Sequence, residues 1–169
     1  MKTFRVGGFE LPVYSSFDLT HVYEPLGGET ILRACNGRGI LQRTWQKTRI
    51  VTSGQGWLPS GVQSLDFDAQ HVVSCVVAET VPASTLTRSV TLPASRRSDA
   101  GHEPFGLAQM PGGETFAVGV SVVGDVATAA ELPGARLYQI GYYPQFTCWL
   151  LRPQRSGPDP KWELIAEEV

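Results

Sequence analysis

The stretch TILRACNGRGILQRTW, residues 30–45, is the part of the sequence that decides the fold class. Two runs rich in Ile, Leu and Thr flank Asn36-Gly37, and this dipeptide is the strongest short hairpin signal because both residues tolerate positive φ angles. We therefore expect residues 30–35 and 39–45 to form two antiparallel strands joined by a tight turn.

The strand pattern continues outward from this hairpin in both directions. Strand-like runs bounded by Gly and Pro include residues 9–14, 17–23, 47–52, 71–78, 86–92, 115–123, 136–143 and 162–168. Run 17–23 alternates apolar and polar residues and is expected to end at Pro25 and Gly27-Gly28. Run 71–78 is the most apolar and is expected to be a central strand packed on both faces.

Two loops interrupt the pattern, and one segment competes for helix. Residues 53–61 are rich in breakers, and Trp57 is expected to anchor this loop. Residues 93–114 are read as one long, exposed, irregular loop, a length that usually signals function or a linker. Residues 62–69 could instead open a short helix.

These runs predict an all-β fold, an antiparallel sandwich or barrel of about ten to twelve short strands with a long irregular loop. The expected organisation is a single β domain over residues 1–169 with the loop at 93–114. A second domain that starts after this loop is the alternative.

Charge and targeting signals exclude several classes of protein. The 14 basic and 16 acidic residues are scattered and give a net charge of −2, so nucleic-acid binding has no electrostatic basis. Neither a secretory signal nor a membrane-length apolar run is present. Cys35, Cys75 and Cys148 lie far apart among apolar or β-prone neighbours and are expected to be buried, inert thiols.

Catalytic and metal-binding motifs are missing from the sequence. Gly-x-Ser-x-Gly, Cys-x-x-Cys, His-x-His and His-Glu-x-x-His do not occur, so we expect no catalytic, metal or cofactor site. His21 and His71 are read as structural residues within strands, and His102 as a surface residue. Asp66-x-Asp68 is the nearest approach to a cation site, and its simpler interpretation is a capped turn.

Several phrases of the sequence resemble proteins of one class. They are residues 44–47 (TWQK), 53–61 (SGQGWLPSG), 65–67 (LDF), 92–99, 142–145 (YYPQ) and 162–168 (WELIAEE). Together they resemble tail-tip and baseplate proteins of long-tailed bacteriophages, the group that includes distal tail proteins.

The resemblance implies a non-enzymatic virion structural protein. Such proteins form symmetric homo-oligomeric rings, often hexameric, that join the tail tube and baseplate hub to the host-recognition apparatus. The implied locations are the virion tail and, during assembly, the host cytoplasm. No specific nucleic acid and no membrane insertion are expected.

The expected subunit interface uses the two loops and the acidic C-terminal strand. Its candidate residues are Trp57, Arg96, Arg97, His102, Phe105, Glu167 and Glu168. Arg96 and Arg97 are expected to pair with acidic residues of a neighbouring subunit.

A carbohydrate-binding module on the same framework is the alternative function. In that case Trp45, Trp57 or Trp149 would stack on sugar rings. A hydrolase is a third, weaker interpretation, since paired carboxylates can meet in space without leaving a sequence pattern.

Overall fold

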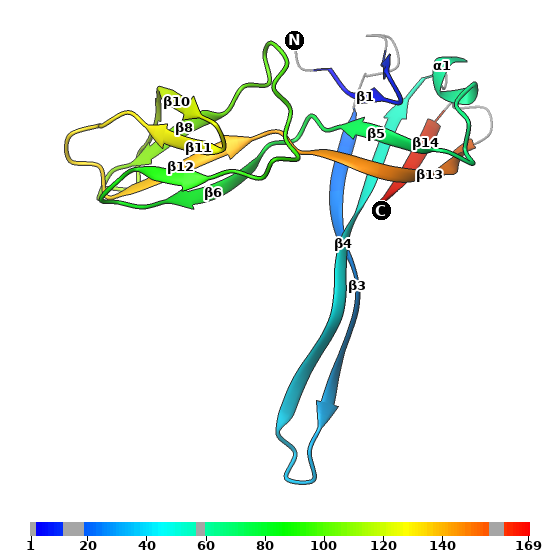
Figure 1. The fold of residues 1–169 in the computed structure, drawn as a ribbon, viewed down its shortest axis with the longest axis horizontal. Helices are drawn as coiled ribbons and strands as arrows, with labels where there is room; N and C mark the ends of the chain where they lie inside the picture. The colour runs from blue at the N-terminus through cyan, green and yellow to red at the C-terminus, as the bar shows by residue number, and fades with distance from the viewer. Residues whose placement is uncertain (1–2, 12–18, 57–59, 156–160) are drawn as a thin grey trace. The chain divides into compact units, whose positions relative to one another are not determined.

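The structure is a computed structural model that describes residues 3–11, 19–56, 60–155 and 161–169. Within these ranges the chain forms fourteen strands and one four-residue helix, α1 (Ser60–Gln63) (Figure 1). The strands form three sheets, and the fold class predicted from the sequence, all-β and antiparallel, is confirmed.

The chain divides into two compact units that interleave along the sequence. Unit 1 comprises residues 1–5 and 74–146, and unit 2 comprises residues 6–73 and 147–169. The predicted single domain over residues 1–169 did not include this division. The alternative boundary after residue 114 is wrong, because residues 93–114 lie inside unit 1.

Unit 1 is a sandwich of two sheets. The four-stranded sheet has the order β6-β12-β8-β9, and the three-stranded sheet has the order β10-β11-β7. Their bounds are β6 (Glu79–Ala83), β7 (Ser89–Thr91), β8 (Phe105–Gln109), β9 (Thr115–Val118), β10 (Val120–Val123), β11 (Val126–Ala129) and β12 (Leu137–Tyr142).

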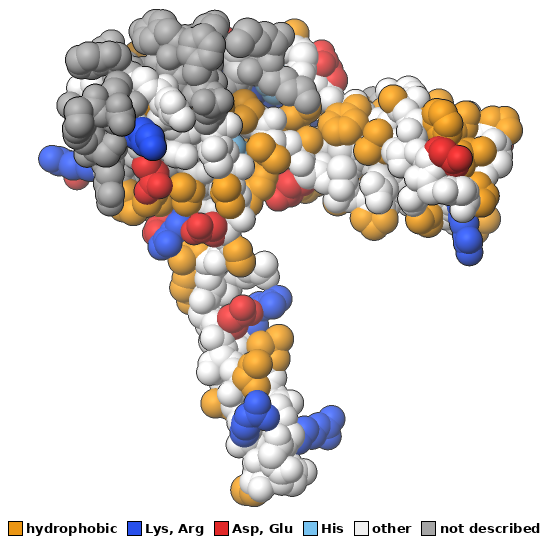
Figure 2. All heavy atoms as spheres, turned by 180° about the vertical axis from the view of Figure 1, so that it is seen from behind, with side chains coloured by type: hydrophobic (Ala, Val, Ile, Leu, Met, Phe, Trp, Pro, Cys, Tyr) orange, Lys and Arg blue, Asp and Glu red, His pale blue; other side chains and the backbone are white. Residues whose placement is uncertain are grey.

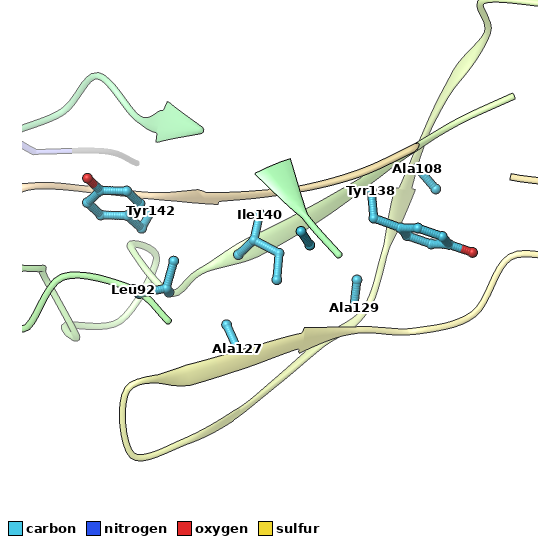
Figure 3. Close-up of a cluster of buried hydrophobic side chains, with 8 residues drawn as sticks. Leu92, Ala108, Ala127, Ala129, Tyr138, Ile140 and Tyr142 are labelled. Atoms are coloured by element: carbon cyan, nitrogen blue, oxygen red, sulfur yellow. The ribbon is translucent and has the colours of Figure 1, made fainter. Parts of the chain in front are cut away.

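Small and large side chains interdigitate between the two sheets of unit 1 (Figure 3). Ala127 and Ala129 of β11 face the sheet that carries Tyr138 and Ile140 on β12, and all four are buried. Alanine opposite tyrosine lets the sheets approach closely without a void. The Tyr138 hydroxyl donates to the Leu132 carbonyl oxygen at 3.1 Å and accepts from the Leu132 N–H at 3.1 Å, so its polar atom is satisfied.

Unit 2 is built on a seven-stranded sheet of order β2-β1-β5-β13-β14-β4-β3. Its strands are β1 (Arg5–Val6), β2 (Phe9–Glu10), β3 (Thr20–Arg33), β4 (Gly39–Gln55), β5 (Gln70–Ser74), β13 (Gln145–Arg155) and β14 (Lys161–Glu168). The strand alternation is clearest in β14, where Trp162, Leu164 and Ala166 are buried on one face. The opposite face of β14 is less covered.

The hairpin predicted from residues 30–45 is confirmed, and it is much longer than expected. Strand β3 does not end at Pro25 or at Gly27-Gly28, because β3 pairs continuously with β4 from Thr20 to Arg33. Strand β3 is the edge of the sheet, and an edge strand tolerates the missing N–H of Pro25. The predicted separate strand 47–52 is part of β4.

Gly28 has a packing role in this hairpin. A bulge shifts the register between Gly28 and Glu29, and Thr44 is the additional residue on β4. The Thr44 hydroxyl donates to the Gly28 carbonyl oxygen at 2.8 Å. A Cβ on Gly28 would lie 2.5 Å from Thr44 Oγ1, so only glycine fits beside the bulge.

Three other expectations need correction. The predicted loop 93–114 contains β8, so the irregular stretch ends at Pro104. Helix α1 begins and ends earlier than the segment 62–69. The strand predicted over 71–78 is β5, which ends at Ser74, and Val72 is 46% exposed, so β5 is not covered on both faces.

A cavity in the buried cluster of unit 1 should lower the free energy of unfolding. Ile140→Ala is expected to lower the free energy of unfolding by about 2–4 kcal/mol, because Ile140 is fully buried between the sheets. Urea unfolding followed by far-UV circular dichroism measures this loss. Leu137→Ala on the same strand, at an exposed position, is the control and should cost about 0.5 kcal/mol or less. Equal losses in the two variants would contradict the assigned core.

Candidate interaction surface

The hairpin of β3 and β4 extends as a two-stranded ribbon beyond the rest of the unit 2 sheet (Figure 1). Strand β14 pairs with β4 only from Gln55 back to Arg49. From that point to the turn, β3 and β4 pair only with each other. We call this ribbon, residues 25–48, the arm.

The end of the arm carries four large apolar side chains that are exposed to solvent. The cross-strand pairs are Ile31 with Leu41 and Leu32 with Ile40. Successive pairs point to opposite faces of a ribbon, so each face carries one apolar pair. All four residues are 51–64% exposed. Neither face of the arm therefore has a covering layer within the described residues.

The turn at the end of the arm is ordered by local hydrogen bonds and is basic. The Arg38 N–H donates to the Asn36 side-chain oxygen at 3.1 Å, and the Ala34 N–H donates to the Arg38 carbonyl oxygen at 3.0 Å. Gly37 has a φ of 80°, which explains the glycine of the Asn-Gly signal.

Cys35 is exposed in this turn, so its predicted burial is wrong, whereas Cys75 and Cys148 are buried as expected.

The root of the arm is anchored in the core of unit 2. Ile50 is buried, and His21 Nδ1 lies 2.8 Å from Thr52 Oγ1 across the β3–β4 pair. The His21 ring also makes an edge contact with Tyr23, at 5.1 Å between centroids. Burial lowers the pKa of His21 to about 4, so the ring is neutral at pH 7. The predicted structural role of His21 fits this position.

One face of the unit 2 sheet is open beside the arm. The register places Leu151, Ile165, Val51 and Val22 in one row across β13, β14, β4 and β3. Leu151 and Val22, at the two ends of this row, are 47% and 43% exposed. We call this row the open face. Figure 2 shows hydrophobic side chains along the arm, together with basic and acidic ones.

A charged row runs beside the open face. The Arg49 guanidinium lies 2.8 Å from Glu167 and 3.9 Å from Glu24. The Glu168 carboxylate accepts the Thr48 N–H at 2.9 Å. The predicted interface residues Glu167 and Glu168 thus have partners on β4 of their own unit.

Unit 1 contains an ionic cluster in the segment that was predicted to be an exposed loop, and its Arg97 and His102 side chains are buried. The Arg97 side chain is inaccessible and donates two hydrogen bonds to Asp99, at 2.9 and 2.7 Å. Its third nitrogen donates to the carbonyl oxygens of Thr3 at 2.7 Å and Cys75 at 2.9 Å. Arg97 therefore joins three separate segments of unit 1.

His102 completes this cluster. Its Nδ1 lies 3.0 Å from Asp99 Oδ2 without hydrogen-bond geometry, and its ring contacts Tyr143 edge-on at 5.2 Å. The hydrogen bonds from Arg97 hold the pKa of Asp99 well below its usual range. Burial and the Arg97 charge lower the pKa of His102. The predicted surface position of His102 is wrong, because the side chain is 1% exposed.

The remaining predicted interface residues are dispersed. Arg96 forms an ion pair with Asp125 at 2.8 Å, and Phe105 is half-buried near Tyr143, with centroids 6.1 Å apart. Trp57 lies outside the described residues. The predicted pairing of Arg96 and Arg97 with Glu167 and Glu168 of a neighbour stays a prediction, and it would compete with the partners found within each unit.

The aromatic residues of the sugar-binding alternative lie on two strands of unit 2. Trp45 is half-exposed on the arm, and Trp149 is half-exposed on β13. Both lie on the same side of the sheet as the open face. Trp149 aligns with Glu167 and Arg49, and Trp45 is four residues from Arg49 along β4. Trp57, the third candidate, is outside the described residues.

Sequence reasoning missed the exposed apolar residues of the arm. The signal was present, because Ile31-Leu32 and Ile40-Leu41 are consecutive apolar pairs on both strands of one hairpin. Consecutive apolar residues in a strand face opposite sides, so they need cover on both faces. The sequence alone could not show that β14 stops short of them.

The ionic cluster predicts a large cost for removing its cation. Arg97→Ala is expected to lower the free energy of unfolding by about 3 kcal/mol or more, since the Asp99 carboxylate and the backbone carbonyls lose their donor. Arg5→Ala removes the more exposed cation that lies 3.7 Å from the same carboxylate, and it should cost about 1 kcal/mol or less. Urea unfolding of both variants tests this, and similar losses would contradict it.

The buried His21 predicts a pH dependence. The unfolded chain takes up a proton below a pH of about 6.5, whereas folded His21 resists protonation until about pH 4. The free energy of unfolding should therefore fall by about 3 kcal/mol between these two pH values from this residue alone. His21→Gln should show a shallower fall.

Urea unfolding followed by tryptophan fluorescence measures this dependence, because the three described tryptophans, Trp45, Trp149 and Trp162, belong to unit 2. Equal pH slopes in the natural chain and the His21→Gln variant would rule out His21 as the source.

Searches of protein-family models, curated proteins and solved structures gave no match to this chain. Among the described residues, no group of three or more His, Cys, Asp or Glu side chains is arranged to hold a metal ion. The Asp66-x-Asp68 pattern caps a turn, since the Asp68 N–H donates to Asp66 Oδ1 at 2.9 Å. No helix of the described part is both long and apolar enough to cross a membrane.

Proposed function

We propose that this chain is a non-enzymatic structural subunit of a phage tail tip or baseplate. It assembles as a homo-oligomeric ring, of the hexameric kind implied by the sequence resemblance, between the tail tube and the host-recognition apparatus. Its place is the virion tail, and the host cytoplasm during assembly. The observation that carries this proposal is the arm, which exposes apolar side chains on both faces.

The energetics of the arm support an assembly role. A two-stranded hairpin by itself is marginally stable in water, and a third strand or a covering layer is normally needed. Exposed apolar patches that border polar residues are typical of protein interaction sites. Residues 31, 32, 40 and 41 lie where unit 2 offers no third strand and no layer among its described residues.

The open face supports the same role through a second surface. Val22 and Leu151 leave apolar area uncovered next to the root of the arm. A subunit in a ring needs two different surfaces, one for each neighbour, because a ring closes through a repeated heterologous interface. The arm is one such surface on unit 2, and the open face is available for a further contact with a neighbouring subunit or another tail protein.

The proposal predicts that an arm with polar residues folds but does not assemble. Ile31, Leu32, Ile40 and Leu41 are changed together to Thr, which keeps a high strand propensity while removing apolar area. Each side chain contributes about 1 kcal/mol or more when covered, so subunit association should weaken by at least about a hundredfold. Native mass spectrometry of the chain alone, and with neighbouring tail proteins, measures the loss.

The matched control is Leu86→Thr, a similar change at an 88% exposed position in unit 1, which should leave association unchanged. Far-UV circular dichroism must show the same strand content in all three proteins. A natural chain that stays monomeric and joins no tail protein, or an arm variant that assembles normally, would refute the proposed role.

A further inference from the structure

Unit 2 contains a surface cavity on the side of α1. The cavity has a volume of about 480 Å³ and lies between the segment that follows α1 and the distal part of β13. Its walls are formed by Gln63, Leu65, Asp66, Phe67, Asp68, Arg152 and Pro153. Ligand sites of this kind span ~300–1,000 Å³, so the cavity can accept two or three side chains.

The lining of the cavity is mainly polar and includes two carboxylates. The half-buried Phe67 and Pro153 provide most of the apolar part, whereas Leu65 is buried. Among the described residues neither Asp66 nor Asp68 has an ion-pair partner, and the hydrogen bond between them uses the Asp68 backbone N–H. Arg152 is the one cation among the described lining residues, and together these residues carry a net charge of −1.

The tip of the arm has the complementary composition. We define the tip as residues 31–41. Arg33 and Arg38 flank the turn, both are exposed, and the Arg33 guanidinium donates only to the Gly37 carbonyl oxygen at 3.3 Å among the described residues. The exposed Ile31, Leu32, Ile40 and Leu41 lie directly behind the two arginines. The tip therefore presents two positive charges next to one exposed apolar pair on each face of the ribbon.

The tip of one chain cannot enter the cavity of the same chain. The arm and α1 belong to the same unit, and Figure 1 shows the turn at the far end of a ribbon that leads away from α1. Continuous pairing from Thr20 to Arg33 keeps the ribbon from folding back. A tip that occupies such a cavity must come from another molecule.

We propose that the tip of the arm docks into the Asp66–Asp68 cavity of a second copy of this chain. The arginines of the tip pair with the two aspartates, and the apolar pair on one face of the tip covers Phe67 and Pro153. The contact is heterologous, so every copy contributes its tip to one neighbour and its cavity to the other, and repetition closes a ring. This inference rests on the proposed function and names the contact that joins the subunits.

Charge reversal on each side tests the contact. The tip variant carries Arg33→Glu and Arg38→Glu. The cavity variant carries Asp66→Asn, which keeps the oxygen that accepts the Asp68 N–H, and Asp68→Lys. Each variant alone should self-associate at least about tenfold more weakly than the natural chain, because like charges now meet in the interface. Analytical ultracentrifugation measures the association.

Mixing the two variants is the decisive experiment. In a mixture, the natural tip meets the natural cavity at one contact, and the reversed tip meets the reversed cavity at the next. Assembly should therefore recover to within about threefold of the natural chain, as expected for complementary charges. A control with Arg136→Glu and Lys161→Glu reverses two exposed cations outside the tip and should associate normally.

The outcomes separate this inference from the proposed function. A tip variant that assembles like the natural chain, or a mixture that does not recover, overturns the tip-to-cavity contact while the ring itself still stands. A natural chain that binds other tail proteins but never its own copies also overturns the contact. A natural chain that neither self-associates nor binds a tail protein overturns both. Far-UV circular dichroism confirms that each variant is folded.

Discussion

The arm exists because two neighbouring strands of the unit 2 sheet, β4 and β14, differ in length. Strand β4 has 17 residues and its partner β14 has 8, so backbone pairing between them ends at Arg49 while β3 and β4 continue together to the turn. Backbone hydrogen bonds are then satisfied only within the ribbon, and its side chains face solvent on both sides. A two-stranded ribbon by itself is marginally stable in water and gains stability from a third strand or a covering layer.

The root and the tip of the arm differ in burial, because the root is packed in unit 2 and the tip is exposed. At the root, Ile50 and the His21–Thr52 contact are buried, which fixes the direction in which the ribbon leaves the sheet. The bulge at Thr44 and the absent side chain of Gly28 add local twist without breaking the pairing. Anchoring at the root limits the conformations open to the ribbon, which lowers the conformational entropy that its exposed residues would lose on binding.

Unit 1 shows how an irregular segment can be rigid without being a strand or a helix. The chain from Pro93 to Pro104 has few ladder bonds, yet Arg97 donates to Asp99 and to carbonyl oxygens of two other segments. These bonds satisfy polar backbone groups that would otherwise be buried alone. The segment predicted to reach a neighbour is therefore held inside its own unit, and the exposed apolar residues lie on the arm instead.

Local residue patterns determined the strand class, the Asn36-Gly37 turn and the alternation of β14, because these depend on neighbours a few residues apart. The continuation of β3 through Pro25 and Gly28 could not be read from sequence, since the same residues end a strand unless an edge position and a bulge accommodate them. Burial of Arg97 and His102 depends on carbonyls and a carboxylate brought together by folding. Exposure of Ile31 and Leu41 depends on whether another layer packs on the faces of the arm, and only the tertiary structure decides that, because such a layer comes from segments distant in sequence.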